Sequence, residues 1–187
     1  MEKMKFLLVI VQLCFMTTNF AATPAWKIVP AKSSLVFVAT QNGAPVKGRF
    51  KKFSGIINFD LDRLNDSKIK ITVDMNSVET SHEELTTTLA TADWFDVKLF
   101  PDAVFESTKF IKDGGNRYHA DGRLTIRDQS APVTVSFTAD QPTKNSAMVK
   151  GSTILKRTAF DVGQGEWASL DEVGDEVKVD FVVSAVR

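Results

Sequence analysis

Apolar and polar residues alternate along most of this chain, and the alternation predicts β-strands. The stretch 46–60, VKGRFKKFSGIINFD, shows the pattern most clearly. One extra residue at Lys51 and Lys52 restores a single apolar face, which predicts a β-bulge in one long, bent strand with Phe50 and Phe53 on the same side. The positions expected on that side, with the glycines keeping it open, are Val46, Gly48, Phe50, Phe53, Gly55, Ile57 and Phe59.

The period changes from two to about four between Ser81 and Ala92, which predicts one short helix. Leu85 and Leu89 lie four residues apart, and Ser81 with Glu84 matches a capping box. The aromatic sequence Asp93-Trp-Phe-Asp96 that follows is expected to cover one end of the fold. Alternation predicts the other strands at 35–40, 67–75, 103–111, 117–127, 133–137, 147–155 and 176–186.

About eight strands joined mostly by tight turns, with one helix, indicate an all-β fold. We favour an eight-stranded antiparallel, lipocalin-like β-barrel with a short helical cap over a sandwich. Closure of the barrel removes the sheet edges, and an interior of this size holds one small ligand.

The first 22 residues have the pattern of a signal peptide. Lys3 and Lys5 precede the apolar run 6–16, and cleavage is expected after Ala21 or Ala22. The domain is therefore expected at 23–187. The single cysteine, Cys14, lies in the leader. An exported domain without disulfides suits a bacterial periplasm.

The sequence contains no catalytic motif that we recognise, so an enzyme is not expected. The two histidines, His82 and His119, stand among polar residues without a partner at a metal-binding spacing, so neither a metal nor a cofactor is expected. The carboxylates of 60–66 do not match a calcium loop and indicate a solvated turn. The formal net charge of +0 and the lack of a basic face make nucleic acid an unexpected partner.

Phenylalanine is abundant, with 14 residues against one tyrosine. Each one alone is consistent with an ordinary core. Together with inward glycines and alanines, however, they predict an apolar lumen that is left open for an elongated apolar ligand. The residues expected to bind it are Phe37, Ala39, Gln41, Gly48, Phe50, Phe53, Phe59, Val73, Trp94, Phe105, Gly122, Leu124, Phe137 and Phe181.

An ordered set of short motifs resembles the YceI-like family of lipid-binding, lipocalin-like barrels. The motifs are Trp26-Lys-Ile-Val-Pro30, Val46-Lys-Gly-Arg-Phe50 with Phe53-Ser-Gly55, Ser77-Val-Glu-Thr80, Asp93-Trp-Phe-Asp96, Phe105-Glu-Ser107, Tyr118-His-Ala-Asp-Gly122 and Arg157-Thr-Ala-Phe160 with Val162-Gly-Gln-Gly-Glu-Trp-Ala168. The resemblance implies a long apolar tunnel that holds a polyisoprenoid or an isoprenoid quinone. It also implies a periplasmic location and, as in some relatives, a homodimer.

Two departures from the family pattern concern the polar end of the tunnel. Gln41 stands near the position where many members have a histidine, and Thr86–Thr88 precede Leu89 where others often have Asp and His. We therefore expect a carrier or scavenger of isoprenoid lipid in which the Gln41 amide contacts the headgroup. The alternative hypotheses are a periplasmic adaptor for a membrane redox or stress system and, third, an enzyme acting on the lipid.

Overall fold

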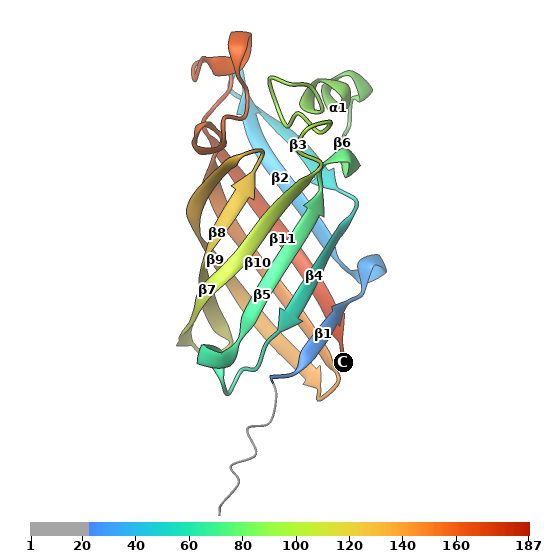
Figure 1. Ribbon diagram of the computed structural model, residues 1–187, viewed down its shortest axis with the longest axis vertical. Coiled ribbons are helices and arrows are strands. Elements are labelled where there is room, and N and C mark those ends of the chain that lie inside the picture. The colour runs from blue at the N-terminus through green and yellow to red at the C-terminus, as the bar shows by residue number, and fades with distance from the viewer. Residues whose placement is uncertain (1–22) are drawn as a thin grey trace, which may run out of the picture.

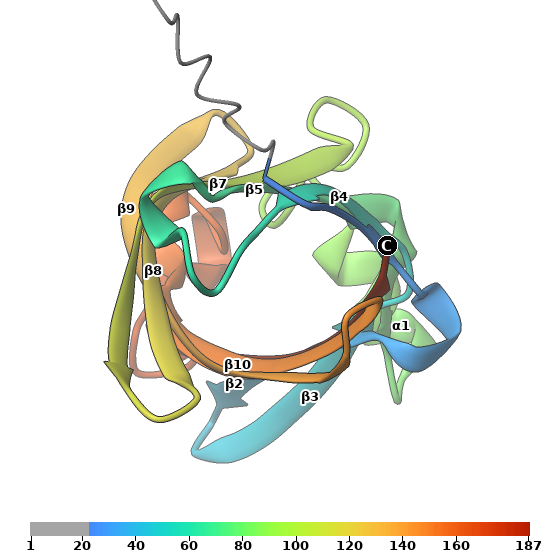
Figure 2. The same cartoon turned by 90° about the horizontal axis from the view of Figure 1, so that it is seen from below.

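Eleven strands pair in one antiparallel sheet that closes on itself, as Figure 1 shows from the side and Figure 2 from below. The computed structural model describes residues 23–187, so the expected signal peptide lies outside the described residues. Within residues 23–187, no helix is both long enough and apolar enough to cross a membrane. The strands are β1 (Ala25–Ile28), β2 (Ser34–Gln41), β3 (Ala44–Phe50), β4 (Phe53–Asn58), β5 (Lys68–Asp74), β6 (Val78–Thr80), β7 (Asp102–Gly114), β8 (Arg117–Ile126), β9 (Gln129–Thr143), β10 (Ser146–Lys156) and β11 (Glu176–Val186).

The eleven strands fill eight positions around the barrel, each called a stave here, and some staves are made of two shorter strands. This confirms the predicted fold class. β1 and β2 make one interrupted stave, as do β3 with β4 and β5 with β6, while β7 to β11 make one each. β1 pairs with both β4 and β11, and β2 pairs with both β3 and β11. These pairings close the barrel both at β1 and at β2. The staves therefore follow one another around the barrel in the order of the sequence.

The stave formed by β3 and β4 has a break where the sequence predicts a bulge. The prediction that Phe50 and Phe53 point to the same side is confirmed, because both lie on the wall of the lumen. The continuous bulged strand is wrong. Lys51 and Lys52 leave the ladder, and their backbone N–H groups donate to the backbone oxygen of Ser77 (3.1 Å) and to its Oγ (3.0 Å). Ser77 therefore takes the place of a strand partner at the point where this stave and its neighbour both bend.

The inward glycines of the wall are covered by side chains of neighbouring strands. A Cβ added to Gly122 would meet the Phe105 ring and would lie 2.6 Å from the carbonyl oxygen of Glu106. The expectation that such glycines leave empty space beside them is therefore wrong. Each instead lets a neighbouring ring lie across its backbone, close to the wall. The pairs of this kind are Phe37 with Gly48, Phe105 with Gly122 and Phe181 with Gly151, and Ile71 covers Gly55 in the same way.

A cap of helix and loops covers the upper end of the barrel. Helix α1 spans Glu83–Leu89 and is shorter than the predicted 81–92. The predicted capping box is wrong, because His82 is the N-cap residue and makes no side-chain cap. Thr80 holds the backbone at the start of α1 instead. Its Oγ1 accepts from the N–H of His82 (3.3 Å) and donates to the carbonyl of His82 (2.7 Å). The loop 90–101 and the segment 157–175 complete the cap, and the latter carries the short 3₁₀ helices η4 (Arg157–Phe160) and η5 (Gly165–Ala168).

Replacing Gly122 by alanine tests the close packing of rings on glycine. The new Cβ would approach the Glu106 carbonyl, which is backbone and unable to move alone, so we expect a loss of about 1–3 kcal/mol in the free energy of unfolding. Gly174→Ala is the matched control, since its added Cβ would meet no atom closer than 3.5 Å. Urea denaturation of both variants measures the difference, and equal stability of the two would contradict this account of the wall.

Candidate functional site

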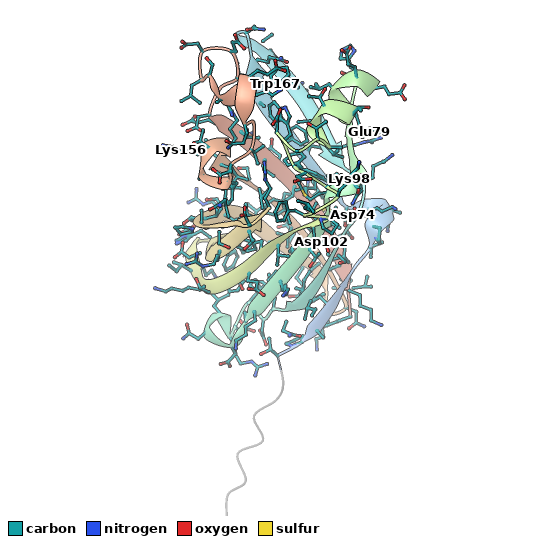
Figure 3. The ribbon with its side chains drawn as sticks, turned by 45° about the horizontal axis from the view of Figure 1, so that its top comes forward. Asp74, Glu79, Lys98, Asp102, Lys156 and Trp167 are labelled. Atoms are coloured by element: carbon teal, nitrogen blue, oxygen red, sulfur yellow. The ribbon has the colours of Figure 1, made fainter. Side chains whose placement is uncertain are left out.

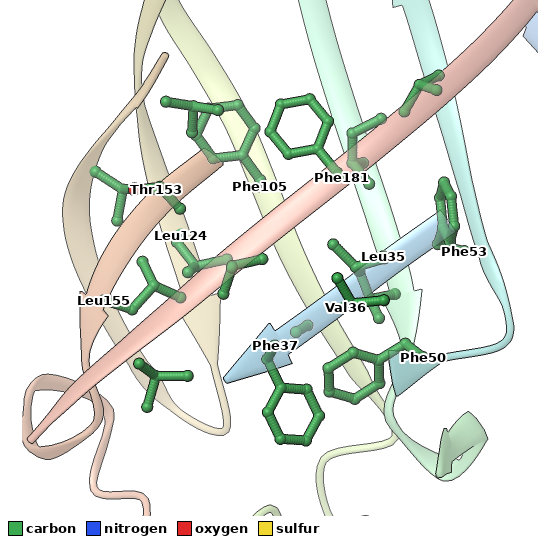
Figure 4. A pocket seen from close by; sticks show the side chains of 18 of the residues that line it. Leu35, Val36, Phe37, Phe50, Phe53, Phe105, Leu124, Thr153, Leu155 and Phe181 are labelled. Carbon is green, nitrogen blue, oxygen red and sulfur yellow. The ribbon is translucent and has the colours of Figure 1, made fainter. Parts of the chain in front are cut away.

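A cavity of about 940 Å³ runs through the barrel from the cap to the opposite end. Its wall is made by alternate residues of every stave, because a strand directs every second side chain to the same face. Figure 4 shows phenylalanines and aliphatic side chains from several strands facing this common space. Apart from the ends, the lining is almost entirely apolar, with members such as Leu35, Ile57, Ile69, Ile71, Val133, Val135, Val149, Leu155, Val177, Val179 and Val183.

Twelve of the fourteen residues expected from the sequence lie on this wall. Gly48 and Gly122 do not, because the rings of Phe37 and Phe105 cover them. The structure thus brings the predicted set together around one space, while contact with a ligand stays a prediction. The residues on the wall are Phe37, Ala39, Gln41, Phe50, Phe53, Phe59, Val73, Trp94, Phe105, Leu124, Phe137 and Phe181.

Three phenylalanines cluster at the lower end of the cavity. The ring centroid of Phe59 lies 5.1 Å from that of Phe110 and 6.2 Å from that of Phe137, and the last two lie 6.4 Å apart. Trp26 fixes this corner, since its Nε1–H donates to the Phe59 carbonyl (2.8 Å). Tilted and edge-on rings attract one another beyond simple burial, so this cluster narrows the lower end of the lumen.

Aromatic side chains also gather below the cap. The rings of Phe37, Phe50 and Phe95 form a chain with centroid separations of 5.7 and 5.9 Å. Trp94 lies 5.7 Å from Trp167, which belongs to the opposite half of the cap. With the top turned forward, Figure 3 shows Trp167 and Lys156 on the side of segment 157–175 and Glu79 and Lys98 on the other side. The expectation that the sequence Asp93–Asp96 covers one end is confirmed.

Arg157 is a buried cation that holds segment 157–175 in place. Its side chain is 4 % exposed, and its guanidinium donates to six backbone carbonyls and to no carboxylate. Burial lowers the pKa of Arg157 from its ordinary value, and the nearby Asp175 opposes that change. Because a loop without regular structure has carbonyls that need donors, one guanidinium replaces the ladder that this segment lacks. The acceptors are the carbonyls of Val162, Gly163, Trp167, Ser169, Val173 and Gly174.

Arg127 joins the two halves of the cap. It lies in the β8–β9 turn with a left-handed backbone, and its Nη1 donates to the carbonyls of Trp94 (2.9 Å) and Asp161 (2.8 Å). The Nε of Arg127 and the indole Nε1 of Trp94 are buried without a hydrogen-bond partner among the described residues. Two unpaired donors make this contact between the cap halves less well satisfied than the Arg157 site.

Most of the polar side chains that line the cavity lie near its two ends, and Thr153 lines it from within β10. Thr40, Gln41, His82, Glu84 and Thr88 lie at the cap, between α1 and the β2–β3 hairpin. Gln41 is half-buried there, in the position where a headgroup contact is expected. Asp60, Asp62, Asp140, Gln141 and Arg187 lie at the lower end.

The solvated turn expected at 60–66 is an ordered one. Asp60 accepts from the N–H of Asp62 (3.0 Å) and pairs with the guanidinium of Arg63 (3.0 Å). The backbone hydrogen bond from Asp62 and the Arg63 pair lower the pKa of Asp60 below its ordinary 3.8, against the opposing effect of burial. Arg187, also at this end, lies over the Trp26 ring, 4.8 Å from its centroid, and donates to the Lys144 carbonyl.

Comparison with known proteins places this barrel in a family. The model of the YceI-like domain matches residues 26–185. The chain belongs to the YceI-like family. It is 32 % identical over 145 residues to a UPF0312 protein of Pseudomonas aeruginosa, a match covering 75 % of this chain and 73 % of that protein. A UPF0312 protein of Vibrio parahaemolyticus is 33 % identical over 90 residues, and the match spans 48 % of each chain, about half the length of that relative.

Solved structures that are similar to this chain have the same architecture. Burkholderia cenocepacia BcnA superposes with a TM-score of 0.81 at 35 % sequence identity, covering 85 % of this chain and 99 % of that one. A polyisoprenoid binding domain from Saccharophagus degradans superposes with a TM-score of 0.70 over 89 % of this YceI-like chain and 99 % of that one. At 16 % identity, the second likeness shows the shared fold alone.

Several residues that shape the cavity were missed by reasoning from the sequence. Phe110 lies on the same face as Phe105 only because the β7–β8 ladder shifts register between Ser107 and Lys109. A strict alternation along the strand therefore places Phe110 outside. No sequence pattern marks Arg157 or Arg127, although a lone arginine near apolar residues such as Phe160 and Val162 is a weak signal of a buried cation.

Replacing Arg157 by methionine keeps an unbranched, mostly apolar stem and removes the guanidinium with all its donors. Because six carbonyls lose their partner in a buried site, we expect unfolding to become easier by about 3 kcal/mol or more. Lys156→Met, at the exposed neighbouring position, is the control and is expected to change stability by less than about 0.5 kcal/mol. Thermal unfolding of both variants checks this, and a stable R157M protein with an unchanged midpoint would contradict the proposed role of Arg157.

Replacing Asp60 by asparagine tests the ordered turn through its pH dependence. A carboxylate with a lowered pKa in the folded state contributes stability above its unfolded pKa and loses it as the pH falls through the folded value. We therefore expect D60N to cost about 1 kcal/mol at neutral pH. The difference from the natural protein should shrink below the ordinary Asp value of 3.8. Urea unfolding at neutral and acid pH measures both, and a difference independent of pH would contradict the assignment.

Proposed function

We propose that this protein is an exported carrier or scavenger that holds an isoprenoid lipid or isoprenoid quinone in the lumen of the barrel, without chemistry on it. The observation that carries the proposal is the apolar cavity of about 940 Å³, which extends along the barrel and has most of its polar residues near its ends. This volume lies at the upper part of the range of about 300–1,000 Å³ for small-molecule sites. A long chain with a polar terminus matches such a space better than a compact polar metabolite.

Burial of the chain supplies the binding energy in this proposal. Each CH₂ group transferred from water contributes about 0.8 kcal/mol, so several isoprene units outweigh the cost of ordering the chain. The flat aromatic wall, with rings such as Phe53, Phe105 and Phe181, offers contact area without directional demands. Binding is then expected to tolerate variation in chain length and to depend little on ionic strength.

The polar terminus of the ligand belongs at the cap in this proposal. Gln41 supplies an amide, and Thr40, Thr88 and His82 supply hydroxyl and imidazole groups around the same opening. Membership of the YceI-like family and the fold shared with a polyisoprenoid binding domain support a lipid ligand. The leader-like pattern of residues 1–22 supports export to the periplasm. We also propose two protein partners, a second copy of this chain in a homodimer and a membrane redox protein. Both can be tested in the same preparations.

A tryptophan that fills the lumen tests the proposal. Val149 lies on the cavity wall, whereas Met148, the preceding residue, lies on the outer face of β10 and is 36 % exposed. We expect V149W to weaken binding of the polyprenyl alcohol solanesol and of ubiquinone by at least about tenfold, which corresponds to 1.4 kcal/mol. M148W adds the same side chain outside and should bind as the natural protein does.

Native mass spectrometry gives the measurement and also identifies any lipid that co-purifies with the natural protein. Equal binding by V149W and M148W would contradict lumenal binding. Failure of every form to bind either lipid, with no lipid in the organic extract, would refute the proposal. Full biological activity of V149W without binding would favour the alternative of a protein adaptor that uses the barrel as a scaffold.

A further inference from the structure

The wall of the barrel has a seam without backbone pairing between β9 and β10. β8 pairs with β9 along its whole length, and β10 pairs with β11 over all of its residues. The β9–β10 ladder, by contrast, starts near the lower end and stops at Ser136 opposite Ser152. Above that pair, residues 129–135 of β9 and 153–156 of β10 have no partner in each other. The two strands therefore face each other across the upper half of the wall without a ladder.

Side chains close this seam in place of the ladder. The Oγ1 of Thr153 donates to the carbonyl of Thr134 (2.9 Å), and Val133 and Leu155 pack against the hydrophobic cluster that contains Phe160 of η4. Pro132 lies within the unpaired part of β9, where a strand residue without an N–H is tolerated. Contacts between side chains separate and re-form more readily than a continuous ladder, in which many hydrogen bonds must break together.

A groove of about 580 Å³ lies on the outer surface along the same seam. Four residues belong both to this groove and to the wall of the lumen, namely Val133, Thr153, Leu155 and Phe160. One layer of side chains thus separates the two spaces. Ile154 lies on the outer side of the groove and is 63 % exposed. Lys156 and Lys178 also line it, but Lys178 pairs with Asp180 (2.9 Å) and Lys156 lies opposite Glu176 in the ladder, so the groove has no strong net charge.

The two ends of the barrel are fastened more firmly than this seam. Segment 157–175 leaves the cap only after its hydrogen bonds to other parts of the chain break. They join Gly163 N–H and Gln164 N–H to the Asp93 carbonyl (2.8 and 2.7 Å), Asn42 N–H to the Glu172 carbonyl (2.7 Å), Gly174 N–H to the Thr40 carbonyl (2.9 Å) and Arg127 Nη1 to the Asp161 carbonyl (2.8 Å). The rings of Phe59, Phe110 and Phe137 narrow the lower end. One hydrogen bond and a few apolar contacts hold the seam.

We propose that the β9–β10 seam is a lateral portal, and that the outer groove binds a segment of the linear apolar chain as it enters or leaves the lumen. This inference rests on the proposed function, because it takes the prenyl chain of the lumenal lipid as the occupant of the groove. The shared wall residues supply a continuous apolar path from Ile154 outside, past Leu155 and Val133, to the lumen. A slender chain passes between two strands more easily than a bulky headgroup, which stays at the cap.

A reversible cross-link across the seam tests the portal. Continuing the register beyond Ser136 and Ser152 places Thr134 opposite Ile154, so Thr134→Cys with Ile154→Cys sets a thiol on each side. The pair is joined as a disulfide or, where the strands stand too far apart for one, by a short dithiol-reactive linker that a reductant cleaves. Ser54→Cys with Thr72→Cys, a directly opposed pair in the unbroken β4–β5 ladder, is the matched control. Cys14 is replaced by serine in both proteins.

The measurement is the rate at which solanesol moves from the loaded protein to phosphatidylcholine vesicles. We expect the closed seam to slow transfer by about tenfold or more relative to the reduced state of the same protein, a barrier increase of about 1.4 kcal/mol. The control should transfer at one rate in both states. Thr153→Val, which deletes the single hydrogen bond across the seam, should transfer faster than the natural protein.

Each outcome decides the inference. Equal rates for the closed and the reduced seam, with solanesol bound in both, would overturn the portal and leave the proposed function in place. Absence of solanesol binding in the reduced protein would overturn the proposed function, and the portal with it. Equal slowing by the control cross-link would also overturn the portal, because it would show that any stiffening of the wall has the same effect.

Discussion

A barrel that holds a ligand must satisfy the backbone hydrogen bonds of its wall without filling its interior with side chains. In this protein the contact that reconciles the two demands is a phenylalanine ring laid across a glycine of the next strand. Where Phe105 covers Gly122, the ring occupies the place of a missing side chain and stays near the wall. The wall is close-packed there, and the space along the axis stays open. Phe37, Phe105 and Phe181 each cover a glycine in this way and also line the cavity.

The cap solves a different problem, because it is irregular chain placed over an apolar space. Its carbonyls have neither a ladder nor a helix to satisfy them, and water would have to enter the lumen to do so. A guanidinium has five N–H donors in one plane, and Arg157 reaches six carbonyls of segment 157–175 because the two hydrogens of Nη2 are shared among three of them. Arg127 does the same on a smaller scale between the two halves of the cap. The cost is a buried charge, which the surrounding carbonyl dipoles offset.

The sequence predicted the barrel and most of its lumen because alternation along a strand is a local property. The parity of Phe50 and Phe53 is correct even though the bulge is in fact a break. Features set by partners distant in the chain were not predictable in this way. Ser77 replaces a ladder partner for Lys51 and Lys52, Thr80 rather than Ser81 fixes the start of α1, and a shift of register turns Phe110 inward. Covering of the inward glycines depends likewise on which ring lies on the next strand.

The unequal fastening of the wall links fold to function. A lumen that buries a long apolar chain shields it from solvent. Exchange of the chain therefore requires that some part of the protein opens at a modest cost in free energy. Backbone hydrogen bonds to Thr40, Asn42 and Asp93 and one hydrogen bond from Arg127 fasten segment 157–175, and aromatic rings cluster at the lower end, whereas the upper part of the β9–β10 seam has side chains in place of a ladder. Pro132 is consistent with that state, because a residue without an N–H could not complete the ladder even if the strands approached. The upper part of the β9–β10 boundary can therefore separate without breaking the β8–β9 and β10–β11 ladders on either side of it.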